Sequence, residues 1–596
     1  MPQTLRLDPG AVIPTGNDFV SFPSIRADDG ALNDFNVLSM EHKGLLEASG
    51  PKGKALITPW ARINKKPLAF KGLSWELRGY WIPTATLESK DLTLKLTYCA
   101  PNGARGAFIR MVASNRSSKP ASVELGLRVQ WSALKRVIYA ATELGGTRSI
   151  SPGPWVADAV VYTQKSDRTL FSWCLQCRGG KWDKQGISKT LQLKAGETQE
   201  AGFFLGVGPE EFSASNSAKT LGDRCDRHGS EAVVAEFEAW CEARSRKLSE
   251  PRFETLMNRN FMFNRFFAWG RTLDSEQLVS VTSRSPRYYV CAAYWDRDAI
   301  IWSFPSLLHT DLDFAREALE HALGIQLRNT GRHSRFIDGT MLEDGFQLDE
   351  ACAPIIAFND YVKASGDRAF LTKYAAGLDT LEAGLMARYV PETGLFSTHE
   401  DSQDEYVKEI YFTYANAMVW KALMALSELR RSPRHAALAA KLKKKIMEHC
   451  VDAKRGIFKR ATDLKHHLFN DVPPGSLLRL PAIGFISEND PVFAKTYEWL
   501  HSDDYEWSQK GLPWGLPTSH RLPFTSIWAV ADRLRLDRGR KRAVEFLDKT
   551  QWDHGIFCEG IDPRTAEAMG GGSAFATVAG YMSHCIYETF KLKKSR

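Results

Sequence analysis

The sequence predicts a two-part chain, an N-terminal antiparallel β-sandwich (a supersandwich) followed by a C-terminal (α/α)6 toroid. Its 596 residues, 43% of them hydrophobic, exceed what one ordinary core needs. Apolar residues recur with period two over about the first 210 positions and at spacings of three and four from about position 230. We place the sandwich domain at 1–230, a helical linker at 231–252 and the helical toroid at 253–596.

In the first part, strands are indicated by apolar and polar residues that alternate along the chain. Residues 92–98, 121–129 and 191–193 alternate apolar and polar side chains, and Pro/Gly turns at 101–103 and 151–154 separate such runs. This pattern is typical of a large antiparallel sandwich.

The second part is predicted to be helical throughout. Helices are predicted at 253–269, 299–308, 314–327, 350–365, 368–389, 409–429, 434–450, 491–501, 523–534, 539–550 and 573–591. With short and long loops alternating, the helices pair into six hairpins that we expect to close into a ring. The long loops then gather on one face, where chemistry usually lies.

Composition narrows the class of protein. The formal charge of +8 comes from 78 basic and 70 acidic residues that are dispersed, whereas a nucleic-acid surface needs a concentrated basic stripe. No signal-peptide core and no run of about 18 apolar residues is present, so we expect a cytoplasmic protein without a membrane partner. The ten cysteines form no regular framework, and Cys174 and Cys177 are predicted to be two thiols on a strand rather than a zinc site.

The segment 294–298 is the most informative motif. Tyr294 and Trp295 offer aromatic faces for the C–H surface of a sugar, and Arg297 and Asp298 offer fixed hydrogen-bonding groups for its hydroxyls. The structural alternative is a buried Arg–Asp pair beside a core Trp. The segment by itself leaves both interpretations open.

Two further segments carry a family resemblance. Residues 347–357 read Gln-Leu-Asp-Glu-Ala-Cys-Ala-Pro-Ile-Ile-Ala, and residues 557–565 read Phe-Cys-Glu-Gly-Ile-Asp-Pro-Arg-Thr before a glycine run at 570–572. Together with Trp-x-Arg-Asp, they resemble the bacterial glucoamylase and glucodextranase group of inverting six-hairpin glycoside hydrolases. The second segment is also similar to a loop of the related processing-glucosidase and mannosylglycerate-hydrolase group.

The resemblance implies a general acid in the loop after the fifth helix and a general base in the loop before the last. Inverting enzymes hold these two carboxyl groups about 6.5–9.5 Å apart, with water between the base and the sugar. Glu400 and Asp401 are the candidate acids, within a cluster that also holds Asp404 and Glu405, and His399 replaces the Trp of glucoamylases. Glu559 is the candidate base. A solvated acidic loop and a helix cap are the respective structural alternatives.

The remaining candidates are assigned to substrate binding. Asp349 and Glu350 are expected to contact sugar, although acids also favour the first turn of a helix. Trp514 and His520 are expected to line further sugar positions.

The predicted function is an inverting exo-acting glycoside hydrolase that releases a terminal sugar, expected to be α-glucosyl, from an oligosaccharide or small glycoside. This chemistry requires no metal and no organic cofactor. A phosphorylase, or an epimerase or uronate-processing enzyme using His399 and His554, is the alternative on the same toroid. The sequence leaves open the linkage, the sugar and whether the chain forms a homo-oligomer.

Overall fold

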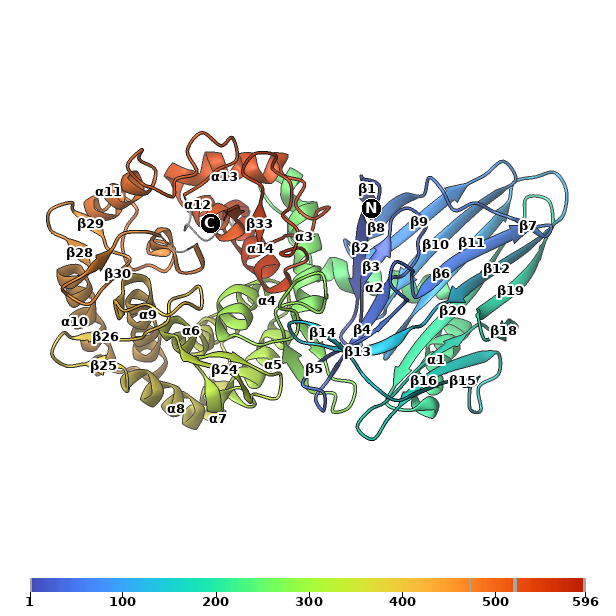
Figure 1. Cartoon of the computed structure of the whole chain (residues 1–596), viewed down its shortest axis with the longest axis horizontal. Helices are drawn as coiled ribbons and strands as arrows, with labels where there is room; N and C mark the ends of the chain where they lie inside the picture. The colour runs from blue at the N-terminus through green and yellow to red at the C-terminus, as the bar shows by residue number, and fades with distance from the viewer. Residues whose placement is uncertain (1–2, 472, 518–522, 593–596) are drawn as a thin grey trace. The chain divides into compact units, whose positions relative to one another are not determined.

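The computed structural model describes residues 3–471, 473–517 and 523–592. The chain divides into two compact units, which are coloured blue to green and green to red along the chain (Figure 1). The first comprises Met1–Ser245, Arg265–Val279 and Ser283–Ala292, and the second comprises Arg246–Asn264, Ser280–Thr282 and Ala293–Arg596.

The first unit is built from antiparallel sheets. The largest sheet has nine strands, in spatial order β1 (Gln3–Leu5), β8 (Ser74–Arg78), β9 (Ile82–Glu88), β10 (Leu92–Cys99), β11 (Gly106–Asn115), β20 (Thr198–Gly208), β17 (Leu170–Gln176), β16 (Ala159–Lys165) and β15 (Thr147–Pro152). A five-stranded sheet has the order β18 (Lys181–Asp183), β19 (Gly186–Leu193), β12 (Ala121–Val129), β6 (Ile57–Ile63) and β7 (Lys66–Pro67). A six-stranded sheet has the order β14 (Ala141–Glu143), β13 (Ala133–Val137), β5 (Gly44–Ser49), β4 (Asp34–Ser39), β3 (Val20–Arg26) and β2 (Val12–Gly16).

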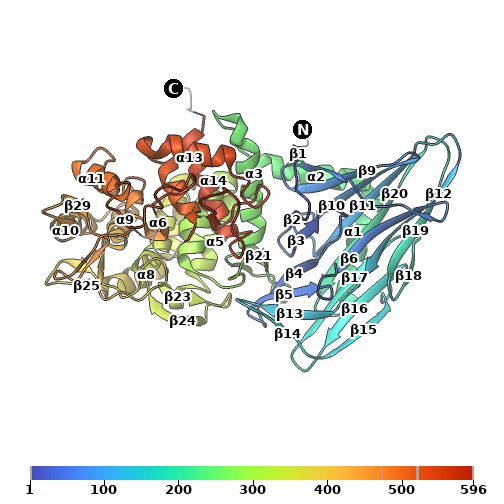
Figure 2. The same ribbon diagram turned by 45° about the horizontal axis from the view of Figure 1, so that its top comes forward.

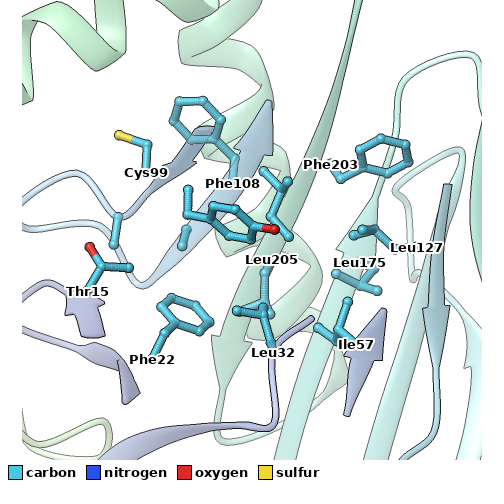
Figure 3. A pocket seen from close by; sticks show the side chains of 14 residues that line it. Thr15, Phe22, Leu32, Ile57, Cys99, Phe108, Leu127, Leu175, Phe203 and Leu205 are labelled. Carbon is cyan, nitrogen blue, oxygen red and sulfur yellow. The ribbon is translucent and has the colours of Figure 1, made fainter. Parts of the chain in front are cut away.

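The core lies between these sheets, because each strand turns one set of alternate side chains inward. Phe35 of β4 meets Trp173 of β17 edge-on at 5.5 Å, and Trp173 stacks on Tyr162 at 4.2 Å. Side chains such as Phe22, Leu205 and Phe203 line a gap in this core (Figure 3). The volume of the gap is only about 20 Å³. A gap of that size is a packing defect with room for about one water.

Two features of this unit bear on the sequence predictions. Helix α1 (Glu211–His228) falls within the predicted sandwich range and packs on β17 and β20. This contact is close, because a Cβ at Gly206 of β20 would lie 2.3 Å from the Ala214 carbonyl oxygen of α1. Helix α2 (Ser230–Ala243) follows. Cys174 lies on β17 as predicted, and burial raises the pKa of Cys174 and of Cys177 to about 12.

The second unit is helical, as the periodicity predicts. Its helices are α3 (Glu254–Phe263), α4 (Phe304–Thr310), α5 (Leu312–Leu323), α6 (Leu348–Ser365), α7 (Arg368–Lys373), α8 (Ala375–Met386), α9 (Thr413–Arg430), α10 (Pro433–His449), α11 (Pro491–Leu500), α12 (Ile527–Leu534), α13 (Asp537–Lys549) and α14 (Ala576–Phe590) (labelled in Figure 1, with most of them seen from a second side in Figure 2). Helices α6, α9 and α14 are buried on most sides, whereas α10 and α13 bury one stripe. The unit therefore has inner and outer helices.

Three predicted helices differ in detail. The predicted helix at 253–269 ends in a π-helical turn at Asn264–Ala268, followed by the short strand β21 (Trp269–Arg271). The one at 299–308 begins as a π-helix at Arg297–Ser303. The one at 368–389 breaks at Tyr374 into α7 and α8. Within the described ranges, no helix is long and apolar enough to cross a membrane.

Candidate active site

Arg297 is the centre of a buried cluster of charged side chains in the second unit. It opens the π-helical turn that continues into α4, so it lies at the N-terminal end of an inner helix. Its Nε donates to Asp349 Oδ2 at 2.9 Å, and its Nη2 donates to Asp349 Oδ1 at 3.2 Å. Nη1 donates to Asp404 Oδ1 at 3.1 Å, and Nη2 also donates to Gln347 Oε1. The guanidinium therefore joins the first turn of α6 to the loop that holds Asp404.

Asp349 is held in its charged form. Its carboxylate accepts a hydrogen bond from Ser402 Oγ at 2.9 Å in addition to those from Arg297. Burial opposes ionisation, but the Arg297 charge and these hydrogen bonds outweigh it and lower the pKa of Asp349. The ion pair is thus a fixed element of the cluster.

Asp298 is held in its neutral form. It is buried and accepts a hydrogen bond from Thr577 Oγ1, in the first turn of α14, at 2.8 Å. Burial raises the pKa of Asp298 to about 8, and the negative charges of Asp404 and Glu559 add to the rise, while Thr577 and Arg297 oppose it. A protonated Asp298 can donate a hydrogen bond at neutral pH.

Glu400 lies beside this cluster and is ionised. His333 Nδ1 lies 3.4 Å from its carboxylate, and Gln347 Nε2 donates to it at 3.2 Å. These partners outweigh burial and lower the pKa of Glu400. A Cβ at Gly345, on strand β24 (Met341–Phe346), would lie 2.1 Å from Glu400 Oε1, so a glycine at this position makes room for the carboxylate.

Asp401 is buried more deeply than Glu400. It accepts hydrogen bonds from the backbone N–H groups of Gln403 at 2.7 Å and Glu405 at 3.2 Å, and it pairs with Arg460. Burial raises the pKa of Asp401, although the Arg460 charge and the Gln403 N–H oppose the rise. The two candidate acids therefore have pKa values shifted in opposite directions.

Glu559 is positioned by its backbone. Its N–H donates to the Gly572 carbonyl at 2.9 Å, and its carbonyl accepts from the Ile527 N–H, at the start of α12, at 2.9 Å. The next residues form strand β33 (Gly560–Ile561), which pairs with β32 (Thr525–Ser526). A Cβ at Gly572 would lie 2.7 Å from the Glu559 Cβ, so only glycine fits there without displacing the carboxylate residue.

Two of the expected sugar-binding residues are occupied by other contacts. The buried Tyr294 donates its hydroxyl to Asp296 Oδ1 at 2.9 Å, and the Arg335 guanidinium lies 4.7 Å from its ring centre. Glu350 is fully buried and accepts a hydrogen bond from the Asp296 N–H at 3.1 Å. Tyr294 and Glu350 thus support the segment 294–298 from behind.

The other expected residues lie in different surroundings. Trp295 is buried, with its ring 6.2 Å from that of His333. The Trp514 ring packs edge-on against the ring of Phe546, with 5.2 Å between the ring centres. Phe546 lies on α13, which is one of the outer helices. His520 lies outside the described residues.

Sequence reasoning gave no role to several residues of the cluster. Gln347 stands inside a quoted segment but has no predicted role, and Asp404 is predicted only as a member of the acidic cluster, not as a partner of Arg297. No sequence pattern predicts the roles of His333 and Thr577, because their partners, Glu400 and Asp298, are distant in the chain. Among the described residues, no group of three or more His, Cys, Asp or Glu side chains is arranged to hold a metal ion.

Known proteins share the fold of this chain but little of its sequence. No known family model matches the sequence. Trehalase 1 of Sulfolobus acidocaldarius is 26% identical over 242 residues, which make up 39% of this chain and 40% of the trehalase. The matched region thus spans less than half of that curated relative.

The decisive similarity is structural. A bacterial glucoamylase complexed with acarbose matches with a TM-score of 0.58 at 12% identity, over 99% of this chain and 96% of that chain. This chain has the glucoamylase fold. The resemblance predicted from the sequence motifs is thereby confirmed at the level of the fold. A metal-independent alpha mannosidase from Streptococcus pneumoniae has a TM-score of 0.47 at 14% identity, over 62% of this chain and 97% of that chain.

Proposed function

We propose that this chain is an inverting exo-acting glycoside hydrolase whose catalytic domain, at 253–596, is an (α/α)6 toroid. The observation that carries the proposal is the surroundings of Asp298. The charges of Asp404, which pairs with the neighbouring Arg297 at 3.1 Å, and of Glu559 both add to the raised pKa of Asp298, which supports a site where the two loops come near one buried carboxyl. Opposed carboxyl groups around one sugar position are what inverting hydrolysis needs.

Asp401 is the favoured general acid. A general acid must be protonated before it can donate its proton to the glycosidic oxygen. Burial raises the pKa of Asp401, whereas the hydrogen-bonding partners of Glu400 lower the pKa of Glu400. Glu400 stays the alternative.

Glu559 is the proposed general base. It is partly exposed and fixed by two backbone hydrogen bonds, which suits a group that must orient a water molecule. In this role it takes a proton from water as the water attacks the anomeric carbon, while the acid protonates the leaving oxygen.

The terminal sugar is proposed to lie against Trp295, Arg297 and Asp298. Asp298, neutral at pH 7, would donate a hydrogen bond to a sugar hydroxyl, and the indole would cover an apolar sugar face. The names of the matched proteins, a trehalase and a glucoamylase, support an α-glucosyl unit as the sugar.

The test is an NMR time course with α- and β-linked gluco- and manno-disaccharides, in buffers with and without phosphate. Release of a free sugar with inverted anomeric configuration in phosphate-free buffer is expected. A sugar 1-phosphate formed only with phosphate would make the chain a phosphorylase and remove the base role of Glu559. A retained anomer would overturn the inverting mechanism.

A further inference from the structure

The second unit contains another cavity, of about 280 Å³, that the proposed hydrolysis does not use. It is lined by α4, α6, α9 and α14, which are labelled in Figure 1. Asp349 opens α6 at the candidate active site, and Asp360 lines the cavity eleven residues later, about 16 Å along the helix. Tyr414 lines the small space beside Asp401, and Lys421 lines the cavity about 10 Å further along α9. The cavity therefore lies near the middles of α6, α9 and α14, one to three turns beyond the N-terminal residues that belong to the candidate active site.

Much of the cavity wall is apolar. These side chains come from the turn before α4, from α4 itself and from α6 and α9, namely Ile300, Ile301, Phe304, Leu308, Ile356 and Met418. A space lined mainly by apolar groups with a few polar ones is the usual form of a small-molecule site.

Lys421 is the polar group that the fold does not explain. Within the described ranges it makes no hydrogen bond and no ion pair, yet burial lowers the pKa of its ammonium group, with Asp360 opposing. It stands in the middle of α9 (Thr413–Arg430), too far from the C-terminus to complement the helix dipole. A half-buried ammonium group that lines a cavity and has no hydrogen-bonded protein partner is free to pair with a ligand in that cavity.

The other ionisable groups make the wall cationic. Arg479 and Arg535 line the cavity with Lys421, and Asp360 is the carboxyl group among the lining residues. Three cations and one carboxyl group give the lining residues a formal charge of +2, but Arg479 is paired with the buried Asp532, 3.6 Å away, so Lys421 and Arg535 are the cations that can meet a ligand. Arg535 lies 3.7 Å from Glu588, but its buried Nη1 has no hydrogen-bond partner among the described residues.

The two histidines of the wall add no charge at neutral pH. His309 and His584 hydrogen-bond each other at 2.9 Å. Burial lowers the pKa of His309 to about 4 and that of His584 well below its ordinary value.

We propose that this cavity binds a small organic anion, whose carboxylate or phosphate group pairs with Lys421 and Arg535 while its carbon skeleton lies on the apolar wall. The shared chemistry is an anionic oxygen group on a compact carbon skeleton. The site is separate from the proposed hydrolysis, and neither depends on the other.

The test is calorimetric titration of the full chain with inorganic phosphate, phenyl phosphate, benzoate and citrate. Binding of at least one organic anion is expected, and Lys421→Met should weaken it at least about tenfold, because a charge-assisted hydrogen bond is lost. Asp360→Asn should strengthen binding, since it removes the negative charge from the wall. Lys444→Met, on the exposed face of α10, should leave it unchanged, as should Glu559→Gln in the candidate active site.

The opposite responses of the two cavity variants make the proposal testable even if one folds poorly. A phosphate-only or carboxylate-only response would support the site and name its ligand. No binding of any of the four anions would overturn the proposal, as would unchanged affinity in a folded Lys421→Met protein. Weaker binding in Asp360→Asn would also overturn it, because the carboxylate would then be a ligand partner.

Discussion

Arg297 and Asp349 form a two-point ion pair in which both side chains are only 2% exposed. The pair joins the turn before α4 to the first turn of α6, and Asp404 and Ser402 extend it to the acidic loop. A buried ion pair of this kind fixes geometry more than it adds stability, but losing one partner leaves a buried charge. The candidate site is therefore built on a rigid anchor.

Loss of the Arg297 charge should destabilise the protein. We expect Arg297→Met to lower the free energy of unfolding by about 3–5 kcal/mol, because Asp349 would be left charged and buried. Urea denaturation measures this. The matched control is Arg434→Met, exposed on α10, which should change stability by no more than about 0.5 kcal/mol. Equal losses in the two variants would contradict the anchor.

Removal of the proposed base should abolish turnover without unfolding the protein. Glu559→Gln keeps the size of the side chain and should reduce kcat by about 10²–10⁴-fold with an unchanged melting temperature. Initial rates and thermal unfolding of the purified variant check this. Activity near that of the unmodified chain would remove Glu559 from the mechanism.

The acid assignment predicts a dependence on the leaving group. Asp401→Asn should lose most activity on an unactivated disaccharide but retain much of it on a glycosyl fluoride, whose leaving group needs little protonation. Glu400→Gln serves as the comparison and should show no such difference. If the pattern appears in Glu400→Gln instead, the two roles are exchanged.

The backbone support of Glu559 can be tested with two glycines of one loop. Gly572→Ala would place a Cβ 2.7 Å from the Glu559 Cβ, so we expect kcat to fall at least about tenfold as the carboxylate shifts. Gly570→Ala meets nothing within 4 Å and should leave kcat unchanged. Comparable kcat values in both variants would show that the close contact at Gly572 has no functional consequence.

The raised pKa of Asp298 predicts a pH-dependent stability. Its pKa is about 8 in the folded protein against an ordinary value of 3.8, so between about pH 4 and 8 the folded state holds a proton that the unfolded chain has lost. Stability should therefore fall as pH rises through that window, by at most roughly 1.4 kcal/mol per pH unit from this group. Asp298→Asn should remove this slope in urea denaturation at pH 5, 7 and 9. Asp313→Asn, exposed on α5, should keep it.

The sequence by itself determined the division into a sheet-rich part and a helical part, the positions of most helices and the loops that carry carboxylates. These features follow from local periodicity, since spacing along the chain states which face of an element is apolar. Strand β12 has the predicted bounds, and the predicted helix at 434–450 corresponds closely to α10.

Only the tertiary structure decided which charges meet and which carboxyl groups keep their protons. Asp298 is held by Thr577, 279 positions away, and Arg297 reaches Asp404 across 107 positions. Tyr294 and Glu350 turned inward to support the motif, and Lys421 came to line a cavity, because burial and charge proximity arise from contacts between distant segments. No local pattern encodes such contacts, whereas the pKa of a carboxyl group depends on them almost entirely.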